Sequence, residues 1–142
     1  MKRRKFLQTI SLLSAAASLP VAATATNEKK KKKFSAAFIS DIHVKPSPVA
    51  EAGMAKALQH VNNLKAAPDF IINGGDSIMD ALAAGKVKTQ EQWDLFNKIM
   101  QAENKLPVKH CLGNHDIWGW QLKEDVKADA LYGKAWWLQQ TS

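Results

Sequence analysis

The stretch that decides the fold is Leu112-Gly113-Asn114-His115-Asp116. A mostly apolar run, residues 106–112, leads into it and predicts a buried strand. Gly113 permits a sharp turn after that strand because it has no Cβ atom. An amide, an imidazole and a carboxylate follow at the carboxyl end of the strand, where open α/β sheets place their sites. Oxygen and nitrogen donors of these kinds bind metals, so we interpret the cluster as part of a metal site.

Two earlier apolar runs end in matching polar groups. Residues 34–40 are followed by Asp41-Ile42-His43, and residues 70–73 are followed by Gly74-Gly75-Asp76. Asp76 comes 35 residues after Asp41 and 38 residues before Asn114. A strand–helix–strand unit needs roughly 30 residues or more, so each interval accommodates one crossover. We therefore predict an α/β fold with parallel strands and crossover helices.

Helices are expected in the connections and after the third strand. Apolar residues at three- and four-residue steps predict one helix over 49–64 and another over about 89–104, the second capped by Thr89. A Ser-x-x-Asp spacing predicts a short helix over 77–84, in which Asp80 is a cap residue and not a ligand. Residues 123–130 and 135–140 are also expected to be helical.

The amino terminus has the organisation of a signal peptide, residues 1–25. A short basic segment precedes an uncharged stretch, and Ala23-Thr24-Ala25 has the small-x-small form of a cleavage site. Arg3-Arg4-Lys5-Phe6-Leu7 resembles a twin-arginine signal, which implies the bacterial twin-arginine export machinery as a partner and a periplasmic or extracellular location. The stretch is too poor in large apolar residues for the alternative, a stable membrane anchor.

The positive charge of the chain is concentrated in two clusters. Nine of its positive charges lie in 2–5 and 29–33, and without them the net charge of +7 becomes −2. Residues 26–33 form a lysine-rich spacer that we expect to be solvated. No aromatic residues interleave the lysines for base stacking, so we expect no specific nucleic-acid partner. Cys111 is the single cysteine, which excludes an internal disulfide, and we expect it to be a small buried residue.

The three loops together predict chemistry at a pair of metals. Asp41 and His43 can turn toward one metal, and Asp76 from the next strand can bridge to a second one, bound by Asn114. Their donor atoms suit Mn, Fe, Zn or Mg. Two metals about 3.5–4 Å apart clamp a phosphate and hold a hydroxide for attack on phosphorus. His115 is then free to protonate the leaving oxygen.

The order Asp-x-His, Gly-Asp, Gly-Asn-His-Asp resembles the calcineurin-like metallophosphoesterase family over residues 34–120, and the region to 138 fits it too. The resemblance implies a hydrolase that cleaves phosphate esters with a dinuclear metal centre. It assigns metal-ligand roles to Asp41 and His43 for the first metal, Asn114 for the second, and Asp76 as the bridge. His115 would contact phosphate and act as the general acid, and Asp116 would orient His115.

Structural roles are the alternative for each of these residues. Asp41 and Asp76 would then be strand-end caps, His43 a loop histidine and His115 a structural histidine. The two histidines that match no motif position, His60 and His110, are interpreted as structural. Trp118 and Trp120 beside the motif either shape a substrate pocket or pack in the core.

The family pattern continues with further histidines, whereas no histidine follows His115 here. This departure predicts that 34–142 is a truncated domain, the amino-terminal part of the family's α/β sandwich with the carboxyl-terminal half missing. The first metal would then have at most three protein ligands and the second two, so we expect this fragment to be inactive. Two alternatives stay open: a non-catalytic remnant or secreted binding module with an incomplete metal site, and a lysine-tail module for anionic polymers.

Overall fold

The computed structural model describes residues 33–142. The expected signal peptide, 1–25, and all but the last residue of the expected spacer, 26–33, lie outside the described residues. The division of the chain into these segments stays a prediction. Within the described part, none of the helices has the length and hydropathy needed to cross a bilayer.

Three parallel strands form the sheet, in the order in which they occur along the chain. They are β1 (Ala36–Ile39), β2 (Phe70–Asn73) and β3 (Val108–His110), and β2 lies in the middle. The register places Phe38 opposite Ile72, and Ile72 opposite Lys109. Parallel neighbours need a crossover between them, and both connections contain a helix. The predicted α/β class with parallel strands and crossover helices is confirmed.

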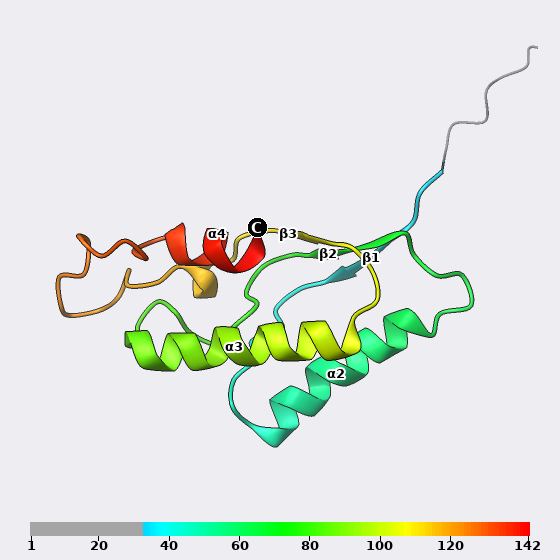
Figure 1. Cartoon of the computed structure of the whole chain (residues 1–142), viewed down its shortest axis with the longest axis horizontal. Helices are drawn as coiled ribbons and strands as arrows, with labels where there is room; N and C mark the ends of the chain where they lie inside the picture. The colour runs from blue at the N-terminus through cyan, green and yellow to red at the C-terminus, as the bar shows by residue number, and fades with distance from the viewer. Residues whose placement is uncertain (1–32) are drawn as a thin grey trace, which may run out of the picture. The chain divides into compact units, whose positions relative to one another are not determined.

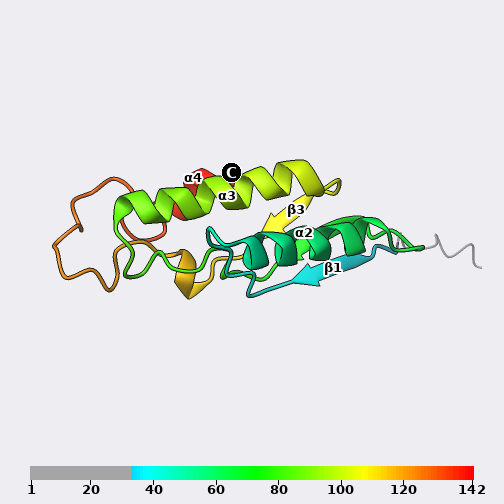
Figure 2. The same ribbon diagram turned by 90° about the horizontal axis from the view of Figure 1, so that it is seen from below.

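The two crossover helices, α2 (Pro48–Asn62) and α3 (Lys86–Glu103), lie side by side on one face of the sheet (Figures 1 and 2). Right-handed crossovers that run in the same direction along a sheet place their helices on the same face. Alternation along β2 sends Ile71 and Asn73 toward the helices, and both are buried. The core between sheet and helices contains Met54, Leu58, Val61, Ile71, Trp93, Phe96 and Ile99.

The opposite face of the sheet stays open within the described residues. Phe38 points to this face and is 69% exposed. Phe34 and Phe70 pair beside it, with ring centroids 5.8 Å apart. Cys111 follows Lys109 by two residues, which places it on the same open side. The expectation that Cys111 is buried is therefore wrong: the thiol is exposed.

A closed loop and a short helix complete the described chain. Trp118 and Gly133 exchange backbone hydrogen bonds of 3.1 and 2.9 Å, which close the loop between them. Trp118 is buried and packs against Trp136 of α4 (Ala135–Thr141), with ring centroids 5.3 Å apart. The helix expected over 135–140 is confirmed. Of the two interpretations of Trp118, the core-packing one is confirmed, while Trp120 is exposed.

Two expected helices are absent from residues 33–142. Over 77–84, Ile78 forms an isolated parallel β-bridge with Val44, and the Ala81 amide donates to the His115 carbonyl. Hydrogen bonds to distant residues therefore replace the bonds that a helix would make. Over 123–130, Asp125 and Asp129 accept hydrogen bonds from amides two residues later, which favours turns.

The start of α3 also differs from the expectation. The helix begins at Lys86, with Gly85 as its N-cap, and not at Thr89. Thr89 is buried inside the first turns, where its hydroxyl donates back toward the carbonyls of Ala84 and Gly85. Asp80 caps a turn and not a helix, because its carboxylate accepts from the Ala83 amide at 3.0 Å.

Candidate metal centre

The three polar loops meet at the carboxyl edge of the sheet. Asp41 and His43 follow β1, Asp76 follows β2, and a short 3₁₀ turn, η1 (Asn114–Asp116), follows β3. Backbone hydrogen bonds join the first two loops: the His43 amide donates to the Asp76 carbonyl at 3.0 Å, and the Asp41 amide donates to the Gly75 carbonyl at 3.2 Å. The parallel sheet therefore brings residues far apart in sequence to one site.

The backbone adopts an uncommon conformation at three of the predicted ligands. Asp41, His43 and Asp76 have φ angles of 57°, 47° and 53°, and they are the non-glycine residues with positive φ in the part of the chain that the structure describes. Such residues cost of order 1–3 kcal/mol each and persist where the surroundings fix them. They cluster at functional sites, so this observation supports the placement of a site here.

Two glycines of the motifs are needed because the second and third loops touch. A Cβ atom on Gly113 would lie 2.1 Å from both the amide nitrogen and Oδ1 of Asp76. A Cβ atom on Gly75 would lie 2.6 Å from the Gly113 nitrogen, and Gly75 also has a φ of 103°. No side chain fits between these loops, which explains a glycine in each motif.

Three side chains converge at the centre of the site. Ligand atoms of His43, Asp76 and His115 all lie within 4.8 Å of one another. His43 Nε2 is 3.9 Å from Asp76 Oδ2, and the rings of His43 and His115 pack edge to face with centroids 4.5 Å apart. His43 Nδ1 is buried without a hydrogen-bond partner among the described residues. Imidazole and carboxylate donors at this spacing fit a divalent metal.

Two further predicted ligands lie at the rim. Asp41 Oδ1 is 3.9 Å from His43 Nε2, but the Asp41 side chain is 69% exposed and its Oδ2 accepts a 2.6 Å hydrogen bond from the Ser40 hydroxyl. Asn114 is exposed at the start of η1. The structure therefore brings His43 and Asp76 together with His115, while Asp41 and Asn114 border this group. The ligand roles of these residues stay predictions.

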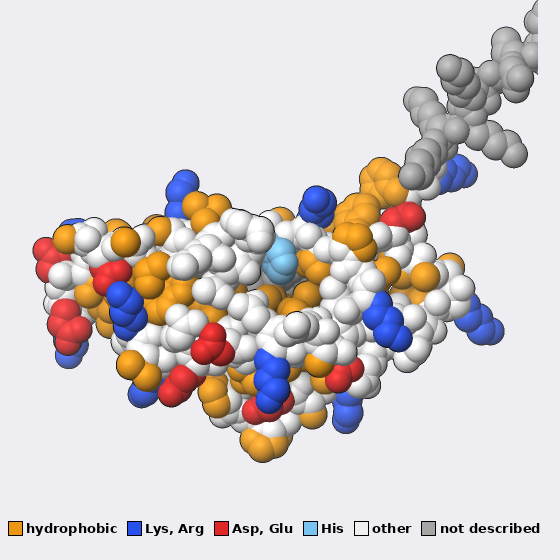
Figure 3. Space-filling model, in the orientation of Figure 1, with side chains coloured by type: hydrophobic (Ala, Val, Ile, Leu, Met, Phe, Trp, Pro, Cys, Tyr) orange, Lys and Arg blue, Asp and Glu red, His pale blue; other side chains and the backbone are white. Residues whose placement is uncertain are grey.

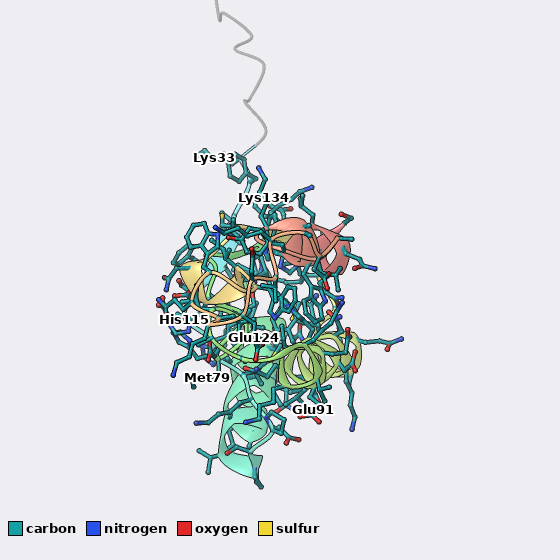
Figure 4. All side chains as sticks on the ribbon, turned by 90° about the vertical axis from the view of Figure 1, so that its left-hand side faces the viewer. Lys33, Met79, Glu91, His115, Glu124 and Lys134 are labelled. Atoms are coloured by element: carbon teal, nitrogen blue, oxygen red, sulfur yellow. The ribbon has the colours of Figure 1, made fainter. Side chains whose placement is uncertain are left out.

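His115 is held at both its backbone and its ring. Its amide donates a 2.9 Å hydrogen bond to Asp76 Oδ1. Its ring Nδ1 bonds to the carbonyl of Met79, which lies beside it in Figure 4. A carbonyl only accepts, so Nδ1 carries the hydrogen, and Nε2 is the ring atom free to gain or release a proton.

Asp116 is fully buried and bonds to backbone amides. Its carboxylate accepts from Ser77 at 2.8 Å, from Ile78 at 3.4 Å and from Gly113 at 3.0 Å. Burial raises the pKa of this carboxyl, and the three amides partly offset that effect. Asp116 was expected to orient His115. In the structure it joins the loops on either side of His115, so any effect on the imidazole passes through the backbone.

Sequence reasoning missed a buried polar group behind the site. Asn73 at the end of β2 is 2% exposed and bonds to Gly75, Ser77 and His110. An amide at the buried end of an otherwise apolar strand was the available signal. His60, interpreted as structural, is exposed on α2, and His110 is part of the Asn73 network.

A comparison with protein families identifies the class of this domain. A family model described as calcineurin-like phosphoesterase matches residues 34–140. The chain belongs to the calcineurin-like phosphoesterase family, a family of metal-dependent phosphoester hydrolases. No curated protein matches the chain. The match confirms the resemblance, including the region from 120 to 138 that was expected to fit the family.

Proposed function

We propose that this protein hydrolyses phosphate esters at a dinuclear metal centre. Asp41, His43 and Asp76 hold the first metal, and Asp76 and Asn114 hold the second. The observation that carries the proposal is the convergence of His43, Asp76 and His115 within 4.8 Å at the carboxyl edge of the sheet. Family membership over 34–140 supports it.

The protein supplies the positions of the donors. When bound, divalent metals polarise the phosphoryl group and activate water. Asp76 Oδ1 is already engaged by the His115 amide, which leaves Oδ2, on the His43 side, for the metals. Asp41, His43 and Asp76 have positive φ angles where their loops leave the strands, and Asp41 Oδ1 and Asp76 Oδ2 each lie 3.9 Å from His43 Nε2.

His115 supplies the proton for the leaving oxygen. The Met79 carbonyl fixes the hydrogen on Nδ1, so the proton that is transferred is held on Nε2 of the imidazolium. The edge-to-face contact with His43 places this ring beside the metal ligands. The substrate is a phosphate ester, bound with its leaving group toward His115.

The second candidate function is metal binding without turnover. The specific observation in its favour is that Asp41 and Asn114 are exposed at the rim of the site. Among the described residues, the side chains that converge are then His43, Asp76 and His115 alone. Such a module binds divalent metals weakly and releases no phosphate.

Hydrolysis of p-nitrophenyl phosphate and bis-p-nitrophenyl phosphate with added Mn²⁺ separates the two candidates. The first predicts metal-dependent turnover that Asp76→Asn or His115→Gln reduces at least ~100-fold, in line with loss of acid–base or metal catalysis. Asp94→Asn and His60→Gln, both exposed and remote on α3 and α2, are matched controls that retain activity. Metal binding without turnover in the unsubstituted chain overturns the first candidate for residues 34–142 and agrees with the inactivity that their short ligand set predicts.

We also propose export through the twin-arginine machinery to the bacterial periplasm or beyond. The basis is the sequence 3–7, which lies outside the described residues.

On the face of the described body that Figure 3 shows, Lys and acidic side chains are interspersed and form no large field of one sign. This mixture argues against an anionic polymer as the partner of the folded domain.

A further inference from the structure

We propose that Asn73 is a positioning residue that holds the metal ligand Asp76 in its binding conformation, with His110 fixing the Asn73 amide. This inference rests on the proposed function in one respect, the role of Asp76 as a ligand. It concerns a buried side chain that does not itself reach the metal site.

Asn73 bonds to the loop on both sides of Asp76. Its Oδ1 accepts a 3.2 Å hydrogen bond from the Gly75 amide, and its Nδ2 donates at 2.8 Å to the Ser77 hydroxyl. The three residues 75–77 are thereby spanned by one rigid side chain. The Asn73 backbone adds a third link, because its carbonyl accepts from the Cys111 amide at 2.8 Å, at the end of β3.

The span is needed because Asp76 and Gly75 both have positive φ angles, 53° and 103°. This backbone conformation is strained for an aspartate, which keeps it only where surrounding bonds fix it. Backbone amides of residues 41, 43 and 44 bind the carbonyls of 75–77, and the Asn73 side chain adds bonds to the Gly75 amide and the Ser77 hydroxyl. Its 2% exposure keeps water from competing for these bonds.

His110 is the third partner of the Asn73 side-chain amide. Its Nδ1 lies 3.1 Å from Asn73 Nδ2, and its ring packs near Phe96 with centroids 6.2 Å apart. Since Asn73 Oδ1 faces the Gly75 amide, Nδ2 is the donor and His110 Nδ1 the acceptor. Burial lowers the pKa of His110, which favours the neutral ring that this bond requires.

The test is the affinity for Co²⁺, measured on the full chain by the visible absorption of the bound ion. Asn73→Ala is expected to weaken binding about 10–100-fold, the usual effect of removing a group that supports a ligand. Ser77→Ala removes one of the two links; we expect it to fold and to weaken binding less than Asn73→Ala. Both variants should change the shape of the Co²⁺ spectrum, which a loss of stability alone would not do.

Asn104→Ala is the matched control. Asn104 also bonds to its own loop twice, to the carbonyl and amide of Leu106, but it lies at the far end of β3. Asn104→Ala should lower the melting temperature without changing the Co²⁺ affinity or the Co²⁺ spectrum. Unchanged Co²⁺ affinity and spectrum in both Asn73→Ala and Ser77→Ala overturns the inference.

Asp76→Asn separates the two failures. If it abolishes binding while Asn73→Ala and Ser77→Ala do not weaken it, the positioning role is wrong and the metal centre stands. If the unsubstituted chain binds no Co²⁺, or Asp76→Asn binds it unchanged, the metal centre and the positioning role both fall.

Discussion

The backbone amide of His115 donates a 2.9 Å hydrogen bond to Oδ1 of Asp76, so the proposed general acid and the proposed bridging ligand are fixed to each other. These residues are 39 positions apart in the chain. The bond commits one carboxylate oxygen to the scaffold and leaves the other beside His43. The position of His115 and the position of the Asp76 carboxylate therefore depend on each other.

Gly113→Ala tests how closely the loops carrying these two residues approach. The added Cβ would lie 2.1 Å from Asp76 backbone and side-chain atoms, so the loops must separate. We expect a loss of about 1–3 kcal/mol in the free energy of unfolding, measured by urea denaturation, and loss of metal binding.

Gly53→Ala is the control for that substitution. Gly53 lies within α2 and has no atom within 4 Å of an added Cβ. Alanine there should stabilise the protein by roughly 0.5–1 kcal/mol and leave metal binding unchanged. Equal effects of the two substitutions would contradict the close approach of the loops.

Asp116→Ala should destabilise the protein more than an ordinary surface change. It leaves the amides of Ser77, Ile78 and Gly113 without their acceptor, and each unpaired buried amide costs about 1–3 kcal/mol. Urea denaturation measures the loss, with the exposed Asp94→Ala as control. A loss no greater than that of the control would show that these bonds contribute nothing.

His110 gives the stability a specific pH dependence. Its pKa in the folded protein is lowered from 6.5 by burial, so the unfolded chain binds the proton first as the pH falls. The contribution is complete above pH 6.5 and is lost as the pH falls toward the folded pKa. His110→Gln should therefore flatten the melting temperature between about pH 7 and pH 5 relative to the unsubstituted protein.

The exposed His60→Gln is the control for that profile, and it should leave the curve unchanged. Melting curves are recorded without metal, so that proton competition for the metal ligands does not contribute. Parallel curves for His110→Gln and the unsubstituted protein would contradict the role of His110.

Export is tested on the signal sequence. Replacing Arg3 and Arg4 together by lysine keeps the charge and removes the paired guanidinium groups, so the protein should stay in the cytoplasm of a bacterial host. Lys5→Arg is the control and should still be exported. Fractionation followed by immunoblotting gives the location; periplasmic recovery of the double variant would exclude the twin-arginine route.

The sequence was sufficient for the strands and the residues at their ends. Short apolar runs followed by Asp41, Asp76 and Asn114 at crossover spacing specify a parallel sheet, because few other arrangements bury such runs. Gly113 was recognised as a turn residue. The contact with Asp76 that excludes a side chain at this position involves a second loop, so it is visible only in three dimensions.

The two expected helices fail for different reasons. Over 123–130, the carboxylates of Asp125 and Asp129 accept from amides two residues later, which favours turns. Over 77–84, the amides find distant partners, as Ala81 does at the carbonyl of His115. Tertiary bonds there outweigh a weak local propensity. The role of Asn73 could not be predicted either, because its partner His110 lies 37 positions away in the chain. The exposure of Cys111 depends on which face of the sheet is covered.

The most direct test of the metal centre is a crystal structure of the protein grown with Zn²⁺, with the metal located by anomalous scattering. We expect a peak between His43 and Asp76, with Zn–N bonds of about 2.0–2.1 Å, and His115 beside it. An absent peak at saturating Zn²⁺, or a peak only at surface residues remote from these loops, would contradict the metal centre.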